Sequence, residues 1–418
     1  MKSLAVSVLL FPLLVITALA QYRTLSENPA IAYSQSAPRD AVARLQKALD
    51  AGETSLAFDE EKGYLPALLE ALKVPVSSQG LVFSRTSLQV DRIAPWSPRA
   101  IYFSDDVYVG WVQGGPIMEI ATVDPSLGAV FYTVTQTAGA KPEIARQTRS
   151  CLQCHESDAT GRMPGFIMRS TITDRHGYPV SSELGVTTDR TPIGDRWGGW
   201  YVTGTIPVPH LGNAITPMLK TEMGNVASYL AKGPVKTSGT VTDLSARFDT
   251  APYLSPHSDA AALLVLAHQT EVHNLITAAG YQARIAPDDR GRIEGAAERL
   301  LRAMLFSGQA LLPGPVTGTS SFAASFAAPG PRDRRGRSLR ELDLQHRVFR
   351  YPFSYLVYSD SFDALPVQVK AYFSRRLREV LDGADTRADF AGLSAADRTA
   401  IREILEDTKP DLLRSSAP

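Results

Sequence analysis

The stretch CLQCHESDATGRMPGF, residues 151–166, contains both cysteines of the 418-residue chain. The two thiols are three residues apart, and His155 follows the second one directly. At this spacing two thiols can add across the two vinyl groups of haem, and the next histidine becomes the proximal iron ligand. The stretch therefore predicts one covalently bound haem c, attached to Cys151 and Cys154, with its iron ligated by His155.

The sequence around this motif agrees with haem attachment better than with other uses of two cysteines. A zinc site needs four ligands and usually a second cysteine pair, which the chain lacks. A thioredoxin-like thiol pair does not require the following histidine. A disulfide closing so small a ring would stabilise the fold little. Behind the motif, Gly161, Pro164 and Gly165 suit close passage of the backbone along a flat macrocycle.

The first twenty residues, MKSLAVSVLLFPLLVITALA, have the layout of a secretory signal peptide. Lys2 forms a short positive region, residues 4–16 are apolar, and Ala18 and Ala20 flank a small-x-small cleavage site. The alternative is a membrane anchor, but the apolar run is shorter than the ~20 residues that cross a bilayer. We predict cleavage after Ala20 and an exported, periplasmic protein without stable membrane association. Covalent haem is attached outside the bacterial cytoplasm, so export supports the haem prediction.

Charge gives no reason to expect nucleic acid as a partner. The full chain has 43 basic and 43 acidic residues, and Lys2 is the only charged residue within 1–20. A nearly neutral protein has no electrostatic preference for an anionic polymer or membrane. We expect a redox partner protein or a small-molecule electron donor or acceptor instead.

Hydrophobic patterns predict an α+β fold with a β-rich N-terminal part and a mostly helical haem-binding and C-terminal part. After the signal peptide we expect a helical lead-in and antiparallel β-rich region (21–136), a haem c-binding region (137–310), and an arginine-rich loop with C-terminal helices (311–418). The expected strands are 81–90, 99–103, 107–112, 118–123 and 129–136, with extended segments at 166–172 and 199–206. The expected helices lie in 43–49, 65–73, 259–279, 295–306, 366–381 and 393–405. Ser258 is the expected N-cap of the helix 259–279, and Gly280 its expected end.

Several segments together resemble a family of exported bacterial proteins described as cytochrome c domain-containing. These segments are CLQCH, RWGGWYVTG (196–204), HLGN (210–213), LAHQTEVHNLI (266–276), GPRDRRGRSLREL (330–342) and RYPFSYLVYSDSFDALP (350–366). The resemblance covers roughly residues 100–370. It implies a single haem c and an exported protein, but no particular substrate, because the family carries no assigned reaction.

The ligand on the other face of the iron decides between a carrier and a catalyst. His210 lies in a loop-like context between prolines and Gly212, and His268 lies on the apolar stripe of the helix 259–279. These two histidines are our candidates, although a lone histidine on an apolar face is more often a hydrogen-bonded core residue. His273 points about 140° away from His268 on the same helix. Met163, Met168, Met218 and Met223 are further candidates whose ordinary role is packing.

Two other features have a possible haem role beside a more ordinary one. Trp197, Trp200 and Tyr201 could wall a macrocycle or simply pack within strands. The arginines between 332 and 340 could pair with haem propionates, but interleaved acids favour a self-paired loop.

These observations favour an exported monohaem c-type cytochrome that transfers electrons in the periplasm. The first alternative is a haem-dependent, peroxidase-like oxidoreductase with an open distal site, and the second is a haem-based binding or sensing module. A minimal cytochrome c domain needs only about 100 residues, and the remaining chain could form a substrate pocket or dock a partner. A single CxxCH motif opposes an enzyme of the di-haem type.

Overall fold

A computed structural model describes residues 24–139, 141–181, 185–233 and 235–414. The predicted signal peptide, residues 1–20, lies outside these ranges. Within them the fold is α+β, as the sequence predicts, with a large antiparallel sheet and several helices. One hydrophobic core includes residues from all three predicted segments.

The main sheet has seven strands in the order β6-β5-β4-β3-β2-β1-β9, and every neighbouring pair is antiparallel. Its strands are β1 (Gly80–Val82), β2 (Arg99–Phe103), β3 (Val107–Trp111), β4 (Ile117–Asp124), β5 (Gly128–Thr135), β6 (Ile144–Arg146) and β9 (Trp200–Tyr201). Two small sheets pair β7 (Arg169–Ser170) with β8 (Gly185–Val186), and β10 (Gly204–His210) with β11 (Thr237–Val241).

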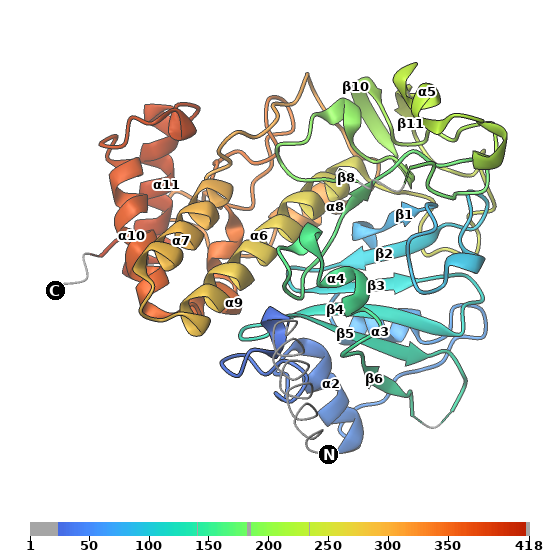
Figure 1. Ribbon diagram of the computed structural model, residues 1–418, viewed down its shortest axis with the longest axis horizontal. Coiled ribbons are helices and arrows are strands. Elements are labelled where there is room, and N and C mark those ends of the chain that lie inside the picture. The colour runs from blue at the N-terminus through green and yellow to red at the C-terminus, as the bar shows by residue number, and fades with distance from the viewer. Residues whose placement is uncertain (1–23, 140, 182–184, 234, 415–418) are drawn as a thin grey trace, which may run out of the picture.

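The helices are concentrated in the C-terminal half. They are α2 (Ala41–Asp50), α3 (Leu65–Ala71), α4 (Leu152–His155), α5 (Val226–Ala231), α6 (Ala260–Ile285), α7 (Arg290–Met304), α8 (Phe322–Ala327), α9 (Asp360–Asp363), α10 (Val367–Leu381) and α11 (Ala395–Thr408). Helix α6 runs diagonally between the sheet and the group formed by α7, α10 and α11 (Figure 1). It therefore joins the β-rich and helical parts of the molecule.

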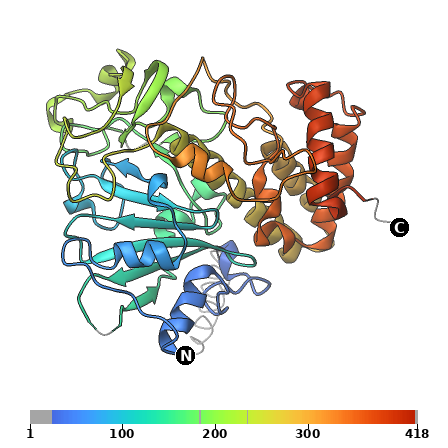
Figure 2. The same ribbon diagram turned by 180° about the vertical axis from the view of Figure 1, so that it is seen from behind.

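The two faces of the main sheet are covered differently. Helix α3 crosses one face (Figure 2), whereas the short helix α4 lies against the other (Figure 1). Strand β6 is an edge strand of the sheet and ends five residues before Cys151. The sheet edge thus delivers the cysteine-containing segment to the face opposite α3.

The expected meander is confirmed for β2 to β5, but the end of the strand 81–90 and both the N-cap and the end of the helix 259–279 were wrong. Of the expected strand 81–90, only the first residues pair, in β1. Helix α6 continues past Gly280 because its next turn has an anchor: the Tyr281 hydroxyl donates a hydrogen bond to the carbonyl of Leu127 at 2.9 Å. The N-cap of α6 is Asp259, whose carboxylate accepts from Ala261 and Ala262. Ser258 instead donates to the carbonyl of Tyr201.

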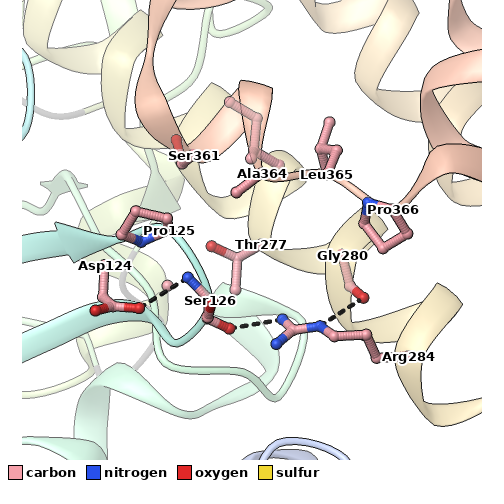
Figure 3. A pocket seen from close by; sticks show the side chains of 12 residues that line it. Asp124, Pro125, Ser126, Thr277, Gly280, Arg284, Ser361, Ala364, Leu365 and Pro366 are labelled. Atoms are coloured by element: carbon pink, nitrogen blue, oxygen red, sulfur yellow. Dashed lines mark hydrogen bonds between the residues drawn. The ribbon is translucent and has the colours of Figure 1, made fainter. Parts of the chain in front are cut away.

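The turn between β4 and β5 is fastened to α6 (Figure 3). Asp124 accepts the backbone N–H of Ser126 at 2.7 Å, and Arg284 donates to the carbonyl of Ser126 at 2.6 Å. Gly128 follows with φ +74°, and a Cβ there would meet Thr277 at 2.4 Å. The cavity at this junction holds about 60 Å³, room for a few water molecules only. We interpret it as a packed junction.

Candidate functional site

Helix α4 carries the CLQCH motif as a single turn. Cys151 takes helical backbone angles at its start, and the N–H groups of Cys154 and His155 both donate to the carbonyl of Cys151. Neither thiol forms a disulfide; Cys151 is partly buried and Cys154 is exposed. Burial raises the pKa of the Cys151 thiol to about 11, with smaller contributions from Glu119 and Cys154. Both sulfurs are thus available on one turn of helix.

The imidazole of His155 is held in one orientation. Its Nδ1 lies 2.9 Å from the carbonyl oxygen of Gly165, and its ring packs on Phe131 with centroids 4.7 Å apart. Since a carbonyl can only accept, Nδ1 carries the proton and Nε2 keeps a free lone pair. Among the described residues Nε2 has no hydrogen-bond partner. Burial lowers the pKa of His155, which favours the neutral, ligand-competent form.

The loop that supplies this carbonyl is clamped from α6. Asn274 Oδ1 accepts the N–H of Phe166 and Asn274 Nδ2 donates to the carbonyl of Phe166, both at 2.8 Å. The N–H of Gly165 also donates to the carbonyl of His155 at 2.9 Å. A Cβ on Gly165 would lie 2.6 Å from Asn274 Oδ1, so only glycine fits. Asn274 therefore fixes the acceptor of the His155 proton without touching His155.

The sheet face beside α4 is only partly covered. Phe131, the residue under the His155 ring, pairs with Ala121 on β4, and in the adjacent cross-strand row Glu119 pairs with Gly110. Ala121, Glu119 and Ile101 are all incompletely buried, and Gly110 has no side chain. The strip beside the helix that carries both thiols is therefore mixed: it contains the Glu119 carboxylate, and the Arg99 side chain lies over Gly110.

Two arginines lie within electrostatic reach of this strip. Arg99 and Arg169 each contribute to lowering the pKa of His155, after the larger effect of burial. Arg99 also pairs with Glu119 at 2.7 Å. Both guanidinium groups come from strands, β2 and β7.

The arginines of the loop between residues 332 and 340 pair with carboxylates of the protein itself. Arg334 pairs with Asp407, Arg335 and Arg337 pair with Glu403, and both acids belong to α11. Arg340 pairs with Asp105. The self-paired interpretation of this loop is confirmed only in part: Arg337 pairs with Asp333 and Arg332 with Glu341, whereas the other partners come from α11 and the β2–β3 turn.

His268 is a core histidine. It is fully buried, with Nδ1 2.6 Å from Asp189 Oδ2 and Nε2 2.8 Å from Ser354 Oγ. Its ring stacks on Phe306 at 4.4 Å. Both nitrogens are occupied, so this arrangement leaves none for iron, and the interpretation of His268 as a distal ligand is wrong for this structure.

His210 is the last residue of β10, and the small β10–β11 sheet lies above the main sheet in Figure 1. Its ring stands at 87° to that of Trp197, with centroids 5.3 Å apart, and its buried Nδ1 has no partner within the described ranges. Burial lowers the pKa of His210 to about 4. It is a free neutral base, but no described contact brings it to the His155 ring.

Most of the remaining candidates are packed in the core. Met163, Met168 and Met223 are buried in the core, while Met218 is exposed. Trp197, Trp200 and Tyr201 pack within the core, Trp200 donating to the carbonyl of Arg169 at 2.7 Å. The structure thus orients the His155 ring beside the two cysteines.

Comparison with known proteins adds no assignment. No protein-family model, curated protein or solved structure matches this chain. Across the described ranges no three His, Cys, Asp or Glu side chains are grouped to hold a metal ion. In the same ranges no helix has the length and apolarity to cross a bilayer. The proposal below therefore depends on the geometry around His155.

The clamp predicts an effect of Asn274→Ala on the imidazole of His155 in the haem-free protein. Without its side chain the Gly165–Phe166 backbone loses two buried hydrogen bonds, each worth about 1 kcal/mol. We expect the Nδ1 proton of His155, followed by NMR of protein with ¹⁵N-labelled histidine, to exchange with water at least about tenfold faster. Gln282→Ala, on the same helix, is the matched control. Unchanged exchange in Asn274→Ala would contradict the clamp.

The buried His273 predicts a loss of stability in acid. Its Nε2 donates to the carbonyl of Asp105 at 2.7 Å, and burial lowers its pKa to about 4. The unfolded chain, with a histidine pKa of about 6.5, binds more protons between these values, so the free energy of unfolding falls as pH drops. Between pH 7.5 and 5, we expect the wild type to lose about 2 kcal/mol more than His273→Gln in urea unfolding. Equal losses would show that His273 does not titrate in this way.

Proposed function

We propose that this protein is an exported monohaem c-type cytochrome that transfers electrons, with its haem on the half-covered sheet face beside α4. The observation that carries the proposal is the Nδ1–Gly165 hydrogen bond of His155, which leaves Nε2 free one residue after two free thiols. Proximal histidines need this second-shell support, because it sets the tautomer and the ring orientation. Bound haem supplies one-electron redox chemistry at its iron.

The residues around the motif fit such a group. Cys151 and Cys154 would form the thioethers, and His155 Nε2 would ligate the iron. Ala121 and Ile101, both incompletely buried, offer apolar surface on this sheet face, next to the Arg99–Glu119 ion pair. Arg99 and Arg169 would pair with the propionates, since a guanidinium binds a carboxylate through two N–H groups.

Export completes the proposal. The N-terminal segment ending at Ala20 has the layout of a cleaved signal peptide, which supports a periplasmic location, where covalent haem attachment takes place. The partner would then be a redox protein or a small electron donor or acceptor.

A second candidate is a haem-dependent oxidoreductase with an open distal site. It is favoured by the contacts of both histidine candidates: both ring nitrogens of His268 are hydrogen-bonded within the core, and the described ring contact of His210 is with Trp197. A haem-based binding or sensing module would share this open site. Electron transfer remains our first choice, because one CxxCH motif supplies one haem.

Covalent haem is tested by intact mass spectrometry of protein produced with a bacterial haem-attachment system. We expect the wild type to gain the mass of one haem after signal cleavage and to retain it in acidified acetone. The double variant Cys151→Ala/Cys154→Ala should lose covalent haem and keep its fold by circular dichroism. A wild type without added mass, or a double variant with it, would contradict the proposal.

The distal site is tested by carbon monoxide binding to the reduced holoprotein. A carrier with six ligands should bind slowly and incompletely, because an internal ligand must first leave. Rapid, saturating binding would support the oxidoreductase or sensor instead. Two variants separate these cases further. If His210 ligates the iron, the visible spectrum of the haem changes in His210→Ala. His268→Ala, if folded, should leave the visible spectrum of the haem unchanged.

A further inference from the structure

A groove of about 880 Å³ opens between α2, α3, the β2–β3 turn and α8. Its apolar lining includes Leu45, Leu72, Phe103, Phe322 and Phe326, each at most 8% exposed. Small-molecule sites commonly have volumes of ~300–1,000 Å³ and mostly apolar walls with a few polar groups. This groove has both properties and lies outside the haem motif.

One wall of the groove is aromatic. The ring centroid of Phe322 lies 5.6 Å from that of Phe103, and the two ring planes are tilted by 48°. The ring centroids of Phe322 and Phe326 are also 5.6 Å apart, and these planes are nearly parallel, at 23°. The row continues inward from Phe103 to Tyr108 at 6.4 Å, and from Tyr108 to Phe166 at 4.5 Å. A flat ring entering the groove would extend an existing row of packed rings, which favours an aromatic body over an aliphatic chain.

The charges lining the groove are unequal. Arg340 and Asp105 neutralise each other at 2.8 Å. Arg44 and Lys73 also line the groove, and neither has a carboxylate within ion-pair distance in the described part of the chain. Asp106 is the one remaining acid of the lining, and burial raises its pKa. The lining of the groove therefore has an excess of positive charge, carried by the exposed side chains of Arg44 and Lys73.

The polar groups of Gln269, which line the deep end of the groove, already have hydrogen-bond partners within the protein. Gln269 donates to the carbonyl of Ser104 at 2.7 Å and to the hydroxyl of Tyr108 at 2.8 Å. Its carbonyl oxygen accepts from Tyr355. No polar contact is therefore required there, and selectivity would come from the aromatic wall and the cations of Arg44 and Lys73.

We propose that this groove binds a small amphiphilic carboxylate with a flat aromatic body, its ring against Phe103 and Phe322 and its carboxylate at Arg44 and Lys73. This site is separate from the proposed haem, and the inference stands without it. The aromatic wall selects the ring, and the surplus cations select the negative charge.

The test is isothermal titration calorimetry with 2-naphthoate as the probe. We expect saturable binding with one site per chain, and much weaker binding of neutral 2-naphthalenemethanol and of octanoate. Arg44→Gln and Lys73→Gln should each weaken naphthoate binding about fivefold, as expected for one exposed charge contact. Lys47→Gln, an exposed residue of α2 outside the groove, should bind as the wild type does.

Three results would overturn the proposal. The first is no saturable binding of naphthoate up to millimolar concentration. The second is equal binding by octanoate or the neutral alcohol, which would remove the ring or the charge from recognition. The third is unchanged binding in Arg44→Gln/Lys73→Gln, because the ligand would then lie elsewhere. The side chains of Arg44, Lys47 and Lys73 are all exposed. Circular dichroism of the variants separates loss of binding from loss of fold.

Discussion

One hydrogen bond decides what α4 can do: Nδ1 of His155 donates to the carbonyl of Gly165. It fixes the tautomer, aims the ring over Phe131, and leaves Nε2 as the atom able to bind iron. A backbone acceptor is useful only if its loop is rigid. Here Asn274 of α6 holds that loop through both polar groups of Phe166. Helix α6 therefore positions the His155 ring through this loop.

The rest of the architecture supports this arrangement. The turn between β4 and β5 is tied to α6 through Arg284, so the sheet that carries Phe131 and the helix that bears Asn274 are directly joined. His268 anchors the other side of α6 by its bonds to Asp189 and Ser354. The helix thus connects the motif, the sheet and the C-terminal helices through buried polar contacts, which are costly to break.

Local patterns were enough to predict the strands β2 to β5 and the motif itself, because alternation and residue spacing are local properties. They also placed His268 inward. They could not reveal Asn274, which lies 108 residues from its partner Phe166, or Arg99 and Arg169, which only folding brings near His155. The partners of His268 are equally distant in sequence, so its inward position was read as a ligand position. Asn274 does lie within the segment LAHQTEVHNLI that the family resemblance singled out.

The central claim is that Cys151, Cys154 and His155 form a covalent haem site, and peptide mapping tests it most directly. Trypsin cuts after Arg149 and Arg162, which releases residues 150–162 with both cysteines and His155. Tandem mass spectrometry of this peptide from holoprotein should show the mass of one haem and fragments that place it on the two cysteines. An unmodified peptide, or a haem carried by another peptide, would contradict the account.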